Sequence, residues 1–148
     1  MTVTWETYVW DSPRPATLDE VEALEQEWGI SFPDDYKRVV MEHQGMSPNP
    51  CVLDLGRSNT AVSELLTLRM DPSRRSYAML HVYSLIKNLV PAGIYPFAGT
   101  GTGDYLCFDY RSSATAPKVV FYFTEALGED ALYPVADSFT DFLSKLHD

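Results

Sequence analysis

The spacing of apolar residues changes along this chain. Residues 18–28 repeat apolar side chains at helical spacing. Three later segments are instead rich in aromatic and β-branched residues and are bounded by turns: 94–98, 104–110 and 118–124. Helices followed by a run of strands and a last helix indicate an α+β fold. We therefore expect helices packed against a mixed, mostly antiparallel sheet, in which these three segments form a meander.

Start and stop signals delimit two helices near the N-terminus. Thr17 and Glu20 form a capping box, and Gly29 stands where a left-handed C-cap belongs. Pro33 suits the first position of a second helix, which Gly45 ends. The short connection between these helices predicts an αα-hairpin.

The same rules predict four further elements. Residues 76–89 show helical spacing and are stopped by Pro91, and Ser138 caps a last helix. Residues 51–55 are typical of a short strand. Residues 61–68 fit a helix or a strand, and we favour a strand.

The length of 148 residues predicts a single domain over 1–148, with a core over 17–146. Residues 1–16 precede it as an extended arm, because Pro13 and Pro15 exclude a helix there. We expect three aromatic side chains of this arm to pack on the chain's own core, the alternative being the core of a partner: Trp5, Tyr8 and Trp10.

Acidic residues outnumber basic ones by 21 to 11, a net charge of −10, which argues against binding to nucleic-acid phosphates. Residues 1–36 contribute nine acids and one base, Arg14, a net of −8. This acidic stretch is either a solvated face or a surface for a basic partner. Arg69, Arg74 and Arg75 form the one basic patch, and we interpret it as a solvated loop.

The candidate catalytic and metal-binding residues do not form a recognised motif. The glycine-rich run 99–103 lies between two predicted strands, so we interpret it as a turn rather than a phosphate loop. Asp104 and Asp109 are five positions apart, which puts them on opposite faces of a strand. We expect no cofactor and no metal site, because the three histidines and the cysteines lack metal-ligand spacing: His43, His81, His147, Cys51 and Cys107. Without a leader or an apolar span, the sequence predicts a cytoplasmic protein with free thiols and no membrane contact.

Three segments, in this order and spacing, resemble the SUKH superfamily. The first runs from Trp28-Gly29-Ile30 through Phe32-Pro33-Asp34-Asp35-Tyr36 to Gln44-Gly45, and the others are 93–109 and 138–143. The sequence departs from the pattern at Gln44-Gly45-Met46, where a double glycine is usual. The resemblance covers about residues 17–146. It implies an α+β fold and a protein-binding role without a catalytic set, and its bacterial members typically neutralise a toxin, often a nuclease.

The leading hypothesis is therefore a cytoplasmic immunity protein that binds a basic cognate toxin domain through acidic side chains. The binding face is either the two N-terminal helices or a cleft of the sheet, and the candidate residues are Glu20, Glu22, Glu25, Glu27, Asp34, Asp35, Asp104, Asp109 and Glu125. One alternative is a regulatory module with a non-toxin partner. Another is an enzyme that uses Asp104, Asp109 and a histidine.

Overall fold

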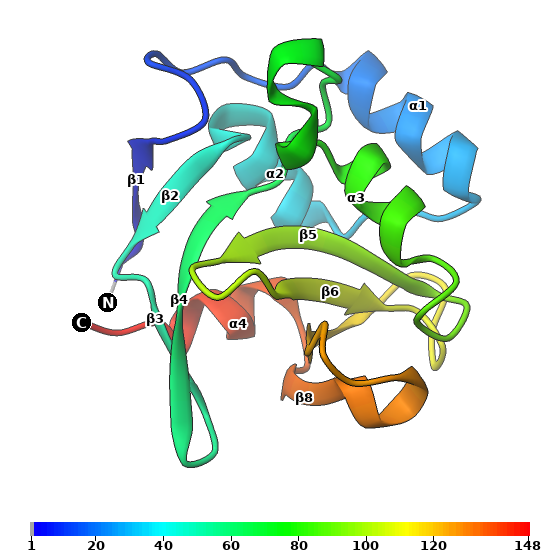
Figure 1. Ribbon diagram of the computed structural model, residues 1–148. Coiled ribbons are helices and arrows are strands. Elements are labelled where there is room, and N and C mark those ends of the chain that lie inside the picture. The colour runs from blue at the N-terminus through cyan, green and yellow to red at the C-terminus, as the bar shows by residue number, and fades with distance from the viewer. Residues whose placement is uncertain (1) are drawn as a thin grey trace.

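A six-stranded antiparallel sheet covered by helices forms the body of the protein, which confirms the α+β class (Figure 1). The computed structural model describes residues 2–148. The helices are α1 (Leu18–Trp28), α2 (Asp34–His43), α3 (Met79–Ile86) and α4 (Phe139–Ser144), with 3-10 turns η1 (Pro72–Tyr77) and η2 (Gly128–Ala131). The strands are β1 (Thr4–Thr7), β2 (Met46–Asn49), β3 (Val52–Leu55), β4 (Ser58–Leu65), β5 (Ile94–Thr100), β6 (Tyr105–Asp109), β7 (Lys118–Tyr122) and β8 (Leu132–Ala136).

The strands of the large sheet follow one another in chain order, from β3 to β8. Each neighbouring pair is antiparallel, and β5, β6 and β7 form the expected meander. Across residues 2–148, parallel pairing is confined to the isolated bridge between Thr67 and Ala78. A second sheet joins β1 to β2.

Both faces of the central strands are buried. Leu106 and Phe108 of β6 face the main core, where they meet residues of α1, α2 and α4. Tyr36 of α2 is fully buried there, with its ring centroid 5.0 Å from that of Phe108. Cys107 faces a smaller core that includes Ile86 at the end of α3. This alternation along β6 agrees with the strand periodicity expected from the sequence.

The predicted helix boundaries are largely confirmed. Thr17 and Glu20 form the capping box at the start of α1, and Gly29 adopts φ 68° just after its end. Ser138 accepts a hydrogen bond from the Asp141 amide and so caps α4. Pro33 is the N-cap residue of α2 rather than its first helical residue.

Three predictions of secondary structure were incomplete. The helix expected over 76–89 is a shorter α3 preceded by η1. The N-terminal arm, expected to be merely extended, contains β1, which pairs with β2. Strand β8 was not predicted, and Pro134 in its middle breaks the usual strand composition.

Two of the three aromatic side chains of the arm pack on their own chain, as expected. Trp10 is buried, and Trp5 stacks on His43 of α2 at a centroid distance of 5.4 Å. Tyr8 remains exposed and meets the edge of Tyr77. The arm is therefore tied to the body at several points along its length.

Candidate functional site

The α1 helix concentrates the acidic charge of the protein. It contains five acidic residues and no basic one, and a buried side formed by Val21 and Leu24 turns these carboxylates outward. The five are Asp19, Glu20, Glu22, Glu25 and Glu27. Their roles differ, because some of them are hydrogen-bonded within the protein.

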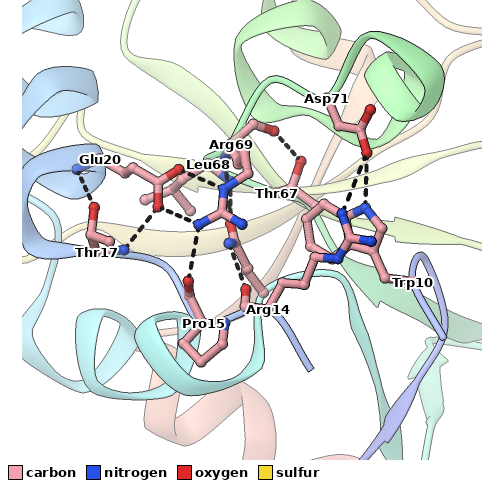
Figure 2. A network of polar contacts seen from close by, with 10 residues as sticks. Trp10, Arg14, Pro15, Thr17, Glu20, Thr67, Leu68, Arg69 and Asp71 are labelled. Carbon is pink, nitrogen blue, oxygen red and sulfur yellow. Dashed lines mark hydrogen bonds and ion pairs between the residues drawn. The ribbon is translucent and has the colours of Figure 1, made fainter. Parts of the chain in front are cut away.

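Glu20 binds Arg69 instead of being free for a partner (Figure 2). The guanidinium donates from Nε to Oε2 at 3.1 Å and from Nη2 to Oε1 at 3.2 Å. Oε1 also accepts a hydrogen bond from the Thr17 amide. Partial burial raises the pKa of Glu20, but the hydrogen bonds from Arg69 and Thr17 outweigh this effect and bring the pKa below its usual value. Glu20 is thus a structural carboxylate.

The basic patch holds the N-terminal arm through hydrogen bonds. Our expectation that it would be a solvated loop was therefore wrong. Arg69 donates to the Pro15 carbonyl at 3.4 Å, and Arg74 donates from Nε to the Val9 carbonyl at 3.1 Å. Arg75 is exposed, and in residues 2–148 no polar contact engages its side chain.

A buried amide supports the same region. Gln44 is 1% exposed, and its Nε2 donates to the Arg14 carbonyl at 2.7 Å. Its Oε1 accepts from the Leu68 amide at 3.0 Å. Nearby, Trp10 donates from Nε1 to Asp71 at 3.0 Å, as Figure 2 shows. The arm and the chain that follows β4 are therefore held together by hydrogen bonds that the sequence pattern did not reveal.

Glu25 and Asp35 also have structural partners. Glu25 accepts from the Phe32 amide at 2.7 Å and thereby closes the turn between α1 and α2. Asp35 accepts from the amide and the hydroxyl of Thr140, at 2.9 and 2.7 Å, and so links α2 to the start of α4.

Asp104 directly precedes β6 and Asp109 is its last residue. Their side chains accept hydrogen bonds from two different turns. Oδ1 of Asp104 accepts from the amide and the hydroxyl of Thr124, both at 2.9 Å. Both carboxylate oxygens of Asp109 accept from Arg111, at 2.9 and 2.8 Å. A recess of about 380 Å³ near β8 includes Asp109 but neither Asp104 nor Glu125 in its lining. Of the three acids at the sheet cleft that we considered as an alternative binding face, this recess therefore includes only Asp109.

His43 and His147 contact residues other than these two aspartates. His43 stacks on Trp5, and His147 contacts Asp54 through Nε2 at 3.0 Å. Over residues 2–148, no hydrogen bond joins a histidine to Asp104 or Asp109, and no group of three potential metal-binding side chains occurs. Burial raises the pKa of the Cys107 thiol far above its usual range.

Four of the predicted acids remain available to a partner. The side chains of Glu22, Glu27 and Glu125 are exposed. Within residues 2–148 these side chains make no hydrogen bond and no ion pair. Asp34 is 87% exposed and lies 3.6 Å from Lys37. Asp19 of α1 has the same free, exposed character, although we did not include it among the candidates.

A groove between α1 and α3 adds apolar surface to this acidic helix. It consists of two recesses, of about 400 and 450 Å³, whose linings share Glu27 and Leu80. Met70 belongs to the first recess, and Trp28 and Tyr83 belong to the second. We refer to these two recesses together as the α1–α3 groove. Sequence reasoning missed it, although the lack of charged residues in 79–86 was a usable signal.

Within residues 2–148, none of the helices is both long and apolar enough to cross a membrane. The fold and this surface define the protein as an α+β domain with an acidic helix beside an apolar groove.

The chain belongs to the SMI1 / KNR4 family (SUKH-1), whose family model matches residues 15–145. This match confirms the resemblance noted in the sequence and covers all four helices and the whole large sheet. A search of curated proteins found no match to this chain.

Proposed function

We propose that the protein is a non-catalytic immunity protein that binds and neutralises a basic toxin domain. Membership of the SUKH-1 family supports this role, because the resemblance implies a protein-binding function of the immunity type. The proposed place of action is the cytoplasm, where a nuclease toxin would meet its nucleic-acid substrate.

The observation that carries the proposal is the set of free carboxylates on α1. Asp19, Glu22 and Glu27 have no internal partner within residues 2–148 and are exposed on a helix that lacks any basic residue. Their charge would speed encounter with a basic surface and disfavour acidic competitors. Many nucleases are basic where they bind phosphates, so an acidic helix can occupy that site in place of nucleic acid.

The structural roles of the other acids make the proposal more specific. Glu20, Glu25 and Asp35 are engaged in hydrogen bonds that hold helices in place. A partner that recruited them would have to break those bonds. Binding is therefore assigned to the free acids, chiefly Glu22 and Glu27.

The same geometry argues against the enzyme hypothesis. Asp104 and Asp109 are separated along β6, and each is held by hydrogen-bond donors of the chain itself. A general acid or base needs a reacting group within reach of its proton, and here turn residues occupy those positions.

The experiment is a binding and neutralisation assay with a candidate toxin, the C-terminal domain of the protein that the neighbouring gene encodes. Calorimetry is expected to give one tight site, and the toxin is expected to lose its activity when the complex forms. If the chain is folded by circular dichroism but neither binds nor protects, the immunity role is wrong and the regulatory-module alternative takes its place.

A further inference from the structure

The α3 helix is unusual for a helix on a protein surface, because it carries no Asp, Glu, Lys or Arg. Met79, Val82 and Ile86 supply its buried side. Leu80 and Leu85 are nevertheless 40% and 60% exposed on its flanks. A helix that is apolar on most of its sides is normally covered, so α3 has the character of an interface element.

The flank that contains Leu80 opens into the α1–α3 groove. Met70, 44% exposed, lies in the same recess as Leu80 and extends the apolar wall. In Figure 1, α1 and α3 run next to each other at the top of the molecule. The groove therefore presents apolar side chains directly beside the acidic helix.

Three aromatic rings pack against one another at one end of the groove. Trp28 lies 4.9 Å from Tyr83 and 4.8 Å from Tyr95, measured between ring centroids, and the two tyrosines are 4.9 Å apart. All three rings line the second recess together with Glu27. Aromatic rings next to a free carboxylate suit a Lys or Arg side chain, whose charge interacts with both.

The charges that line the groove, two acidic and two basic, are unevenly distributed. Arg69 is neutralised by Glu20, with which it forms two hydrogen bonds. Glu27 is free on the α1 rim, and Glu22 lies on the same helix. Lys87, beyond the end of α3, is the basic residue at the opposite rim. The α1 side of the groove is thus acidic, and its occupant should be basic on the side that faces α1.

We propose that the α1–α3 groove is the docking surface for a basic amphipathic segment of a partner protein. The apolar side chains of that segment would contact Leu80 and Met70, and its lysine or arginine side chains would meet Glu27 and the ring of Trp28. The proposal rests on the proposed function in taking the occupant to be another protein, and it adds the face and the chemistry of the contact.

A second copy of this chain fits the groove poorly. A two-fold symmetric contact through this face would place one α1 against the other, and each carries five acids and no base. Like charges that face each other across an interface are unfavourable. The net charge of −10 opposes self-association in the same way.

The test titrates the full-length, ¹⁵N-labelled protein with a synthetic helical peptide of leucine and lysine, about four turns long. We expect the largest amide shifts on both walls of the groove, at Ala23, Glu27, Leu80 and Tyr83. A peptide in which glutamate replaces lysine is the control and is expected to cause no such shifts.

Two matched variants of α3 make the test specific. Leu80→Gln is expected to raise the Kd for the leucine and lysine peptide about tenfold, because it removes an apolar contact at the centre of the groove. Leu85→Gln makes the same change on the same helix outside both recesses, and its Kd is expected to match that of the wild type. Both positions are exposed and glutamine favours helices, so both variants should fold.

Equal weakening by Leu80→Gln and Leu85→Gln, or shifts confined to other surfaces, would overturn the groove proposal. Its failure is distinguishable from failure of the immunity role. Tight toxin binding that Leu80→Gln leaves unchanged would refute the groove alone. Peptide binding in the groove by a chain that neither binds nor neutralises the toxin would refute the immunity role alone.

Discussion

Arg69 and Glu20 are 49 residues apart in sequence and form two parallel hydrogen bonds, at 3.1 and 3.2 Å. This contact joins the first turn of α1 to the chain after β4, and Arg69 also binds the carbonyl of Pro15 in the segment before α1. The pair therefore anchors the acidic helix rather than serving as part of its free charge. The predictions below separate anchoring acids from free ones.

A double-mutant cycle tests the anchor. Glu20→Gln and Arg69→Met are each expected to destabilise the protein, with a coupling energy of about 0.5–1 kcal/mol, since the two side chains are partly exposed. Urea unfolding of the wild type, the two single variants and the double variant measures it. Strict additivity of the two changes would show that the contact contributes nothing in solution.

Gln44 is expected to be the most sensitive polar side chain of this region. Gln44→Ala removes the partner of the partly buried Leu68 amide and of the Arg14 carbonyl, so the free energy of unfolding should fall by roughly 2–4 kcal/mol. Gln26→Ala, on the exposed side of α1, is the matched control and should change it by less than about 0.5 kcal/mol. Similar losses in both variants would contradict the role given to Gln44.

The buried carboxyl group of Glu64 is expected to make the stability of the protein depend on pH. Glu64 is 7% exposed, its Oε2 lacks a hydrogen-bond partner within residues 2–148, and burial raises its pKa to about 7. The folded state therefore holds this proton more tightly than the unfolded chain does. The contribution of Glu64 to stability is greatest at acidic pH and is lost as the pH rises from about 4.5 towards 7.

The variant Glu64→Gln removes this titration. It should leave stability nearly unchanged at pH 5 and raise it by on the order of 2–3 kcal/mol at pH 8 relative to the wild type. Unfolding curves of both proteins at these two pH values provide the measurement. A difference that does not vary with pH would mean that Glu64 is not a buried, unpaired acid.

Asp104 is expected to matter for stability and not for partner binding. Asp104→Asn weakens the contacts with the amide and hydroxyl of Thr124, so the free energy of unfolding should fall by about 1 kcal/mol. Toxin affinity should remain within about twofold of that of the wild type. A loss of toxin affinity without a loss of stability would show that Asp104 belongs to the binding surface.

Local signals were sufficient to predict much of this fold. The capping box at Thr17 and the glycine at 29 specify α1 through contacts within a few residues, and such patterns can be read directly. Strands β1 and β8 escaped prediction for a physical reason. Each is short and is defined by pairing with a distant segment, and Pro48 and Pro134 weaken the local strand signal in β2 and β8.

The site was predictable in its charge and not in its contacts. The sequence shows that α1 is acidic, but the partners of its acids come from elsewhere in the fold, as Arg69 does for Glu20. The contact between Asp35 and Thr140 spans 105 residues. The exposure of Leu80 could not be predicted either. Helical spacing identifies the buried side of α3, but it does not show which neighbouring elements cover the other sides.

The most direct test of the central claim compares two charge reversals of equal size in toxin binding. The double variant Glu22→Lys/Glu27→Lys changes the free acids of α1, and Asp130→Lys/Asp137→Lys makes the same change in net charge at exposed acids that are not candidate binding residues. Calorimetry at low and high salt should show that the α1 variant binds at least about a hundredfold more weakly and loses most of the salt dependence. The control should bind like the wild type. Equal affinity of the two double variants, or tight wild-type binding insensitive to salt, would contradict the claim that the α1 carboxylates direct binding.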